Sequence, residues 1–195
     1  MYLITADGAR ARDPGAYDLV VSLGSERSAY DDTLPWIALE IDLLRDAVSA
    51  DIPVLGICFG SQILARALGG QALPGARTEI GWVQIRSDEP ELVAEGPWFQ
   101  WHHDTFTAPP GAVLLADSPA GPQAYVVGRS LAVQFHPEVT IPIVEEWVSL
   151  GGDQLVRHGV DAAGLMAETR ARADENRSRA WRLLDAFVDR VAAIA

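Results

Sequence analysis

The chain has 195 residues, of which 49% are hydrophobic and 22% charged, a composition typical of a folded domain rather than of a disordered chain. Its formal net charge of −12 argues against a nucleic-acid binding protein, because such proteins carry a basic face that neutralises phosphates. All 15 basic residues are arginine, which excludes a phosphate-binding lysine of the Walker type and a Schiff-base lysine.

The single cysteine, Cys58, cannot build a disulfide framework, which favours a reducing compartment. The N-terminal "MYLITADGAR" has no basic flank followed by a long apolar stretch, so it is a poor signal peptide. No apolar run approaches the ~20 residues that span a bilayer. We therefore expect a cytoplasmic protein that does not enter a membrane.

The first third of the sequence alternates short apolar runs with stretches of helical periodicity, a pattern typical of βα units around a mostly parallel sheet. It predicts strands at residues 1–5, 18–24 and 52–57, and helices at residues 34–49 and 59–70. Pro35 suits the first turn of the earlier helix, and Gly69 and Gly70 end the later one.

Residues 78–117 have a different texture, with alternating and aromatic-rich runs, and we interpret them and the hairpin that follows as antiparallel additions to the sheet. The segment 121–138 predicts a hairpin around Gly128, with residues 131–135 as its second strand. The predicted fold class is α/β: an open, mostly parallel sheet with flanking helices, antiparallel strand additions and a helical C-terminal tail.

The tail from Gly152 onward is helical in pattern, with Asp161 as an N-cap. One apolar stripe runs along it, formed by Ala180, Leu183, Leu184, Phe187, Val188, Val191 and Ile194. We expect this stripe to dock on the body; a partner-binding helix is the alternative. No repeat or linker interrupts the chain, which predicts a single domain over residues 1–195, with an α/β body at 1–150 and a helical extension at 151–195.

Residues 54–62, "VLGICFGSQ", place Cys58 where an apolar strand stops and a helix begins. Strand, Gly-x-Cys-x-Gly, helix is the layout of a nucleophile elbow, here with cysteine in place of serine. The unsatisfied N–H groups and dipole of the following helix favour an anion at this position, and therefore a thiolate. The N–H of Phe59 would point toward the oxyanion formed after attack on a carbonyl. The alternative is a buried structural cysteine.

A cysteine nucleophile needs a base, and His136 in "LAVQFHPE" is the best candidate of the four histidines. We expect Pro137 to stop the strand and hold the chain extended, so that His136 and Glu138 project to the same side. Glu138 could then accept from one ring nitrogen while the other faces Cys58. In isolation, such a His-Pro-Glu segment also fits a surface turn.

The same residues allow a metal site, but one cysteine without a CxxC or HxxxH companion is a thin ligand set for zinc. The run "WHHD" at residues 101–104 also suggests a metal, yet adjacent histidines on an extended chain point in opposite directions. We therefore predict no metal and no cofactor, and expect Trp101, His102 and Asp104 to line the pocket.

The motifs "GICFGSQ" and, 78 residues later, "QFHPE" resemble those of the class I (triad-type) glutamine amidotransferases. The resemblance extends from about Asp18 to Glu138 and is strongest to free-standing members related to the amidotransferase domain of GMP synthase. It implies the flavodoxin-like fold of that family and a Cys-His-Glu triad that hydrolyses the side-chain amide of glutamine.

By this resemblance, Cys58 would attack the amide to give a γ-glutamyl thioester, His136 would transfer protons, and Glu138 would orient His136. Gln62 matches the residue that helps hold the substrate, and N–H groups of Phe59 and of the Gly24 loop would meet the oxyanion. The family usually has two consecutive glycines in that loop, whereas Ser25 follows Gly24 here.

Family members generally open with a strand and helix ahead of the strand that residues 1–5 resemble, so we expect this first βα unit to be missing. The leading function is ammonia release from glutamine for an unknown acceptor, which a separate synthase subunit could carry. A γ-glutamyl amide or peptide hydrolase with the same triad, and a catalytically idle regulatory subunit, are the alternatives. The oligomeric state and pathway are left open.

Overall fold

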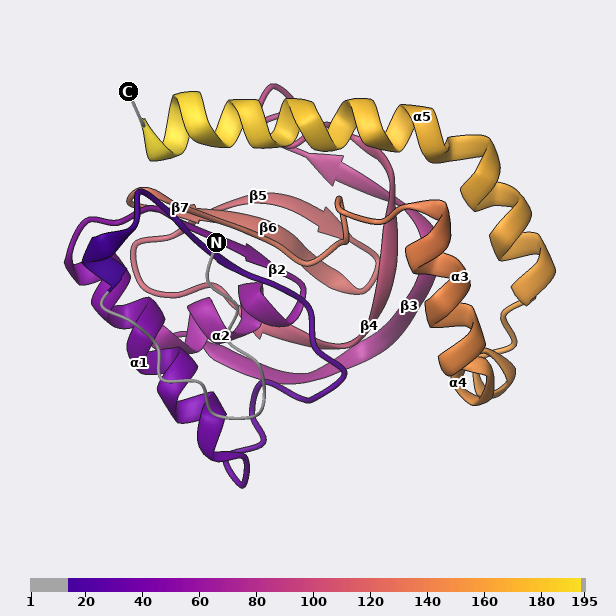
Figure 1. The fold of residues 1–195 in the computed structure, drawn as a ribbon, viewed down its shortest axis with the longest axis horizontal. Helices are drawn as coiled ribbons and strands as arrows, with labels where there is room; N and C mark the ends of the chain where they lie inside the picture. Colours follow the sequence, from indigo (N-terminus) through magenta and orange to yellow (C-terminus); the bar gives the residue numbers. More distant parts are fainter. Residues whose placement is uncertain (1–13, 194–195) are drawn as a thin grey trace.

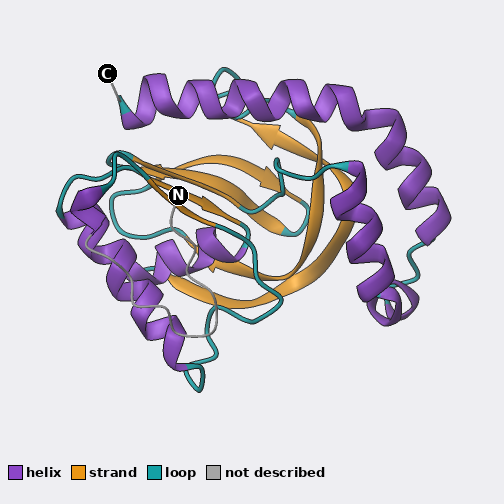
Figure 2. Cartoon of the chain, in the orientation of Figure 1, coloured by secondary structure: helices purple, strands orange, loops and turns teal. Residues whose placement is uncertain are grey.

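The computed structural model describes residues 14–193 as an α/β fold built on a curled seven-stranded sheet (Figures 1 and 2). The strand order is β1-β2-β7-β6-β5-β3-β4. The strands are β1 (Val20–Ser22), β2 (Val54–Ile57), β3 (Gln71–Ser87), β4 (Gly96–Thr107), β5 (Val113–Ser118), β6 (Gly121–Val127) and β7 (Ser130–Val133). The helices are α1 (Pro35–Ser49), α2 (Phe59–Ala67), α3 (Ile141–Leu150), α4 (Gly152–Arg157) and α5 (Ala162–Ala186), with short helical turns at Pro14–Ala16 (η1) and Phe187–Ala192 (η2).

The predicted fold class is confirmed, with one adjustment to the sheet. Among the described strands, only the pairs β1–β2 and β2–β7 are parallel, whereas β7–β6, β6–β5, β5–β3 and β3–β4 are antiparallel. The connections between strands explain this pattern. Parallel neighbours need a long crossover connection, whereas the strands from β3 to β7 follow one another without a helix between them. The parallel part is therefore smaller than expected. The predicted strand at residues 1–5 lies outside the described residues.

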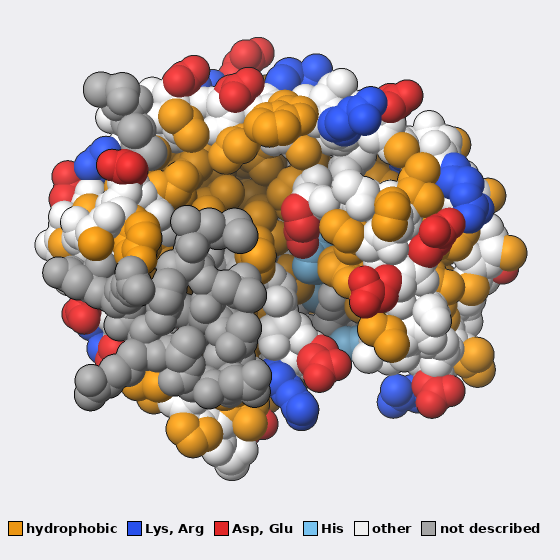
Figure 3. All heavy atoms as spheres, viewed as in Figure 1, with side chains coloured by type: hydrophobic (Ala, Val, Ile, Leu, Met, Phe, Trp, Pro, Cys, Tyr) orange, Lys and Arg blue, Asp and Glu red, His pale blue; other side chains and the backbone are white. Residues whose placement is uncertain are grey.

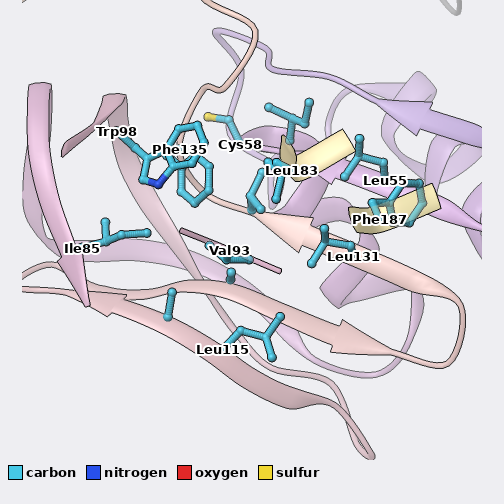
Figure 4. Close-up of a cluster of buried hydrophobic side chains, with 14 of the residues drawn as sticks. Leu55, Cys58, Ile85, Val93, Trp98, Leu115, Leu131, Phe135, Leu183 and Phe187 are labelled. Atoms are coloured by element: carbon cyan, nitrogen blue, oxygen red, sulfur yellow. The ribbon is translucent and has the colours of Figure 1, made fainter. Parts of the chain in front are cut away.

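Helices cover both faces of the parallel part of the sheet (Figure 2). On one face, α1 and α2 pack on β2 around Ile37, Leu44 and Ile63, all fully buried. On the other face, Leu183 of α5 and Phe187 of η2 cover Leu55 and Leu131, and Cys58 belongs to the same cluster (Figure 4). This double cover explains why every residue of β2 is buried and why its sequence is apolar throughout.

The C-terminal tail docks on the body, as its apolar stripe predicts. Leu183 and Phe187 are buried, and Leu184, Val188 and Val191 pack against the same cluster; Ile194 lies outside the described residues. Asp161 caps α5, since its side chain accepts from the N–H of Ala163 at 3.0 Å. Nowhere in residues 14–193 does a helix combine the length and apolarity needed to cross a membrane.

The end of β7 differs from the prediction. The strand stops at Val133 rather than at Phe135, and residues 137 and 138 form a turn that leads into α3. The backbone N–H of Gln134 still donates to Gln123 of β6, the partner strand of β7, whereas the N–H of His136 donates to Phe99 of β4. The parallel strands β1, β2 and β7 thus deliver the Gly24 loop, Cys58 and the His136 turn to the same edge of the sheet, where α/β proteins bind ligands.

Candidate active site

Cys58 occupies a strained corner between β2 and α2. Its backbone has φ 53° and ψ −109°, a region that residues with a side chain rarely adopt. Such a conformation costs on the order of 1–3 kcal/mol and persists only where the surroundings enforce it. The Cys58 N–H donates to Val133 O at 2.8 Å, and the Cys58 carbonyl accepts from the Ser61 hydroxyl at 2.6 Å. The predicted elbow is therefore present, and hydrogen bonds of its backbone with Val133 and Ser61 fix it.

The glycines on either side of Cys58 permit this corner. A Cβ at Gly60 would lie 2.1 Å from the carbonyl oxygen of Ser22 in β1, and one at Gly56 would lie 2.7 Å from the carbonyl oxygen of Gly60. Both contacts are with backbone atoms, which cannot swing aside as a flexible side chain can. The Gly-x-Cys-x-Gly pattern is thus required for β1, β2 and α2 to approach one another closely.

His136 is buried beside Cys58 and Glu138. Its Nδ1 lies 2.7 Å from Glu138 Oε1, and its ring meets the edge of Trp147 at a centroid distance of 4.8 Å. Burial by itself disfavours the imidazolium, but Coulombic attraction to and hydrogen bonds with Cys58 and Glu138 outweigh burial and raise the pKa of His136 to about 10. The imidazole is therefore positioned between a sulfur and a carboxylate.

The route by which His136 meets Glu138 differs from the expectation. An extended chain through Pro137 was predicted to put both side chains on one side, but residues 137 and 138 form a turn. The His136 N–H donates to Phe99 O of β4 at 2.8 Å, so this turn is held by a neighbouring strand. The predicted pairing of the two side chains is present, and a turn rather than an extended segment produces it.

Gly24 lies against the imidazole. A Cβ at this position would be 3.0 Å from His136 Cε1 and 3.9 Å from Cys58 Cβ, so a side chain here would press on the ring. Phe59, the first residue of α2, is buried and packs its ring on Trp36 at 5.5 Å. Phe59 thus has two parts in the structure: its backbone continues directly from Cys58 into α2, and its side chain packs in the core.

Gln62 and Gln134 form a buried amide chain that ends at the sulfur. Gln62 Nε2 donates to Gln134 Oε1 at 3.1 Å and to Asp104 O at 3.3 Å. Gln134 Nε2 in turn donates to Cys58 Sγ at 3.6 Å. Gln134 was not predicted from the sequence, although it is a polar residue in an otherwise apolar run, two positions before His136.

The two adjacent histidines of β4 point in opposite directions, as predicted. His102 is buried and its Nε2 lies 3.2 Å from Glu79 Oε2, whereas His103 lies in the exposed region beside Thr78. Burial opposes ionisation of Glu79, but hydrogen bonds from His102 and Ser118 outweigh it and lower the pKa of Glu79. His102 Nδ1 also donates to Asp104 O at 2.9 Å, which connects this pair to Gln62.

Asp104 joins the loop after Gly24 to the end of β4. Its carboxylate accepts from the Ser28 hydroxyl at 2.7 Å and from the Tyr30 hydroxyl at 3.0 Å. Within residues 14–193, no three His, Cys, Asp or Glu side chains gather in a way that could hold a metal ion.

The surface view in Figure 3 shows histidine atoms inside a hollow, with acidic side chains around it.

Comparisons with known proteins identify the family. Residues 14–143, more than half of the chain, match the family model "Glutamine amidotransferase class-I". The GMP synthase [glutamine-hydrolyzing] of Thermus thermophilus is 36% identical over 145 residues, which cover 66% of this chain and 28% of that protein. The corresponding GMP synthase of a Parafrankia species is 37% identical over 138 residues, covering 66% and 24%. The chain thus spans about a quarter of the length of these curated relatives.

Solved structures agree with the sequence matches. A glutamine amidotransferase from Thermotoga maritima superposes with a TM-score of 0.83 and 30% identity, covering 91% of this chain and 81% of that one. One from Methylobacillus flagellatus gives a TM-score of 0.85 and 29% identity, covering 92% and 79%. The resemblance stated from the two motifs is confirmed, and the chain belongs to the class-I glutamine amidotransferase family of enzymes.

Proposed function

We propose that the chain hydrolyses the side-chain amide of glutamine, with Cys58 as nucleophile, His136 as proton carrier and Glu138 as the group that orients His136. One observation carries this proposal: the buried imidazole interacts with the Cys58 sulfur and with the Glu138 carboxylate, and both interactions raise its pKa. A base between a nucleophile and an orienting carboxylate is the arrangement that nucleophilic catalysis requires.

The first half of the reaction forms a thioester. With His136 protonated, Cys58 reacts as a thiolate, whose sulfur bonds to the amide carbon while the carbonyl electron pair moves onto oxygen. When the carbon–nitrogen bond breaks, the imidazolium gives its proton to the departing nitrogen. Ammonia leaves, and a γ-glutamyl thioester remains on Cys58.

The second half regenerates the enzyme. The neutral imidazole takes a proton from water as the water oxygen attacks the thioester, and the carbon–sulfur bond then breaks. Glutamate leaves, and the thiolate–imidazolium pair is restored. Glu138 stabilises the imidazolium and fixes the ring in both halves, which is the role of the carboxylate in other triads.

We assign the backbone N–H groups of Phe59 and of the Gly24 loop to the oxyanion. The close approach of Gly24 to His136 and Cys58 supports the assignment of that loop. We assign Gln62 to substrate binding. Its two side-chain N–H groups already donate to Gln134 and Asp104, so Gln62 would bind glutamine by accepting a hydrogen bond at Oε1.

The ammonia is proposed to serve a synthase, because the curated relatives reported above are glutamine-hydrolyzing GMP synthases. A second candidate function is that of a γ-glutamyl amide hydrolase, which acts on the conjugate of a small amine. It is favoured by the net charge of −12 and by the acidic side chains around the hollow in Figure 3, because these would attract the amine.

A paired assay tests these assignments. Glutamate release is measured from glutamine and from a γ-glutamyl conjugate of a small amine, and Cys58 is labelled with a diazoketone analogue of glutamine. Turnover of glutamine and labelling that Cys58→Ala abolishes are expected. Turnover of the conjugate alone would replace the first function by the second. A folded protein that neither turns over substrate nor reacts with the analogue at neutral pH would be an idle subunit.

A further inference from the structure

The helix α5 contacts the turn that carries Glu138. Asn176 lies within α5 and is buried, with 3% of its surface exposed. Its Nδ2 atom donates to Pro137 O and to Val139 O, both at 3.2 Å. These two carbonyl groups belong to the residues immediately before and after Glu138. One amide group from a helix outside the matched residues 14–143 therefore holds the backbone on both sides of Glu138.

The orientation of this amide is fixed by its partners. A side-chain amide has two N–H donors, and both are used on the turn. The opposite atom, Asn176 Oδ1, is buried without a hydrogen-bond partner among the described residues, which disfavours the polar side chain at this position. A flipped amide would direct that oxygen at two carbonyl oxygens. The N–H groups are therefore the reason that an amide fits here.

The turn has a backbone anchor on its β4 side, where the N–H of His136 donates to Phe99 O, but it needs further support on its α5 side. It follows the end of β7, and Pro137 has no N–H to donate. An apolar groove of about 600 Å³ separates part of the turn from α5, and Glu138 and Val139 help to line it. Close packing therefore does not fix Glu138 from this side.

We propose that Asn176 is a positioning residue that holds the Glu138 turn so that its carboxylate stays at the His136 imidazole. The inference rests on the proposed triad, since it concerns how that triad is assembled. It makes α5 part of the catalytic apparatus, although α5 falls in the segment expected to be an extension of the body. Asn176 acts through Glu138 and does not touch the reacting atoms.

Two substitutions and one matched control test the proposal. Asn176→Leu removes both donors at similar volume, and Asn176→Asp keeps the shape but directs a carboxylate oxygen at the two carbonyls. We expect kcat for glutamine to fall about ten-fold with Asn176→Leu and further with Asn176→Asp, with KM within about two-fold, because two hydrogen bonds that act on the transition state through Glu138 are lost.

Thr169→Val is the control, because Thr169 is also a buried polar residue of α5. Its hydroxyl donates to Leu165 O at 2.8 Å and accepts from Trp82 Nε1 at 3.1 Å. This variant should lower the melting temperature while leaving kcat unchanged. If both Asn176 variants behave like Thr169→Val, with lower stability and wild-type kcat, Asn176 only anchors the helix and the proposal is overturned.

Titration of His136 by NMR separates this inference from the proposed function. The His136 signal, identified by its loss in His136→Gln, should titrate at lower pH in the Asn176 variants than in the wild type, and unchanged in Thr169→Val. If the wild type does not hydrolyse glutamine, the proposed function is refuted. The His136 titration would still show whether Asn176 positions the Glu138 turn. If Asn176→Asp fails to fold, Asn176→Ser keeps one donor and should give intermediate values; wild-type titration in Asn176→Ser and Asn176→Leu would overturn the proposal.

Discussion

Cys58 and Glu138 are fixed in different ways, although both belong to the same candidate triad. Cys58 is held mainly by neighbours in the sequence at the β2–α2 corner, namely two glycines and the hydroxyl of Ser61 three residues later, and also by the β7 backbone. Glu138 depends on β4 and on α5, which are far from it in the sequence, and one of its carboxylate oxygens is buried without a partner among the described residues. The Cys58 corner is therefore built mainly by residues adjacent in the sequence, with β1 and β7 packed against it, whereas the position of Glu138 depends on contacts from distant parts of the chain.

The largest expected effect is that of Cys58→Ala on catalysis. Removing the nucleophile should lower kcat by about 10⁴-fold or more while the protein stays folded, because little volume is lost. Steady-state glutamate release and a thermal melt measure the two quantities. Activity near the wild-type level in a verified Cys58→Ala sample would exclude Cys58 as the nucleophile.

The same variant should change the protonation of His136. Because the pKa of His136 is raised to about 10, the stability that its protonation adds is complete below about pH 6.5 and disappears as pH rises through about 10. Without Cys58, one of the two groups that raise this pKa is gone, so the loss should occur at lower pH. Denaturant unfolding between pH 6 and pH 10 measures the shift; identical profiles for both proteins would contradict the assigned contact.

Gly60→Ala is expected to disrupt the Cys58 corner. The added Cβ would meet the Ser22 carbonyl at 2.1 Å, so β1 and α2 must separate. We expect a loss of about 3 kcal/mol in the free energy of unfolding, together with loss of activity, because the Cys58 corner is displaced. Gly152→Ala is a matched control for a glycine near the start of a helix, since nothing lies within 4 Å of its Cβ position and its φ is not in the left-handed region. Equal stability of the two variants would show that the corner tolerates a side chain.

Glu138→Gln is expected to have a smaller effect, because it keeps the shape of the carboxylate but removes its charge. We expect kcat to fall about 100-fold, and the pH at which His136 titrates to fall, since Glu138 is one of the groups that raise its pKa. A pH–rate profile and an NMR titration measure these changes. A loss as complete as that of Cys58→Ala would mean that Glu138 does more than orient the ring.

The smallest effect is expected from Gln134→Leu. This substitution removes the N–H that donates to Cys58 Sγ at 3.6 Å, a weak contact to sulfur, and leaves Gln62 without one partner. We expect kcat to fall about five-fold, and the rate of Cys58 alkylation to fall in parallel, because a hydrogen bond to the thiolate is lost. An unchanged alkylation rate would assign Gln134 to packing alone.

The difference between how Cys58 and Glu138 are held also explains what could be predicted from the sequence. The elbow depends on residues that are adjacent in the chain, so "GICFGSQ" predicts its strand, corner and helix directly. The conformation of Pro137 and Glu138 depends on Phe99 and Asn176, whose positions no local pattern reveals, and the prediction of an extended segment was wrong. Gln134 was missed for the same reason: its meaning comes from Gln62 and Cys58, which only the fold brings next to it.

The sheet shows the same limit at a larger scale. Apolar runs separated by helices predict the parallel strands β1 and β2, because the crossover helix between them leaves its own period in the sequence. The long strands β3 and β4 contain the alternating and the aromatic-rich run, but their antiparallel partners depend on how the sheet curls. The proportion of parallel pairs was therefore overestimated, although the class of the fold was predicted correctly.

The way in which α5 is anchored has a consequence for its motion. The N-terminal end is capped by Asp161, and beyond its C-terminal end the Arg129 guanidinium donates to the carbonyl of Ala192 and to that of Asp51. Helices usually fray from their termini, where backbone groups lack partners. Because contacts hold both ends of α5, unfolding of the helix does not start easily at either end. The amide hydrogens near Asn176 should therefore be among the slowest in the helix to exchange with solvent.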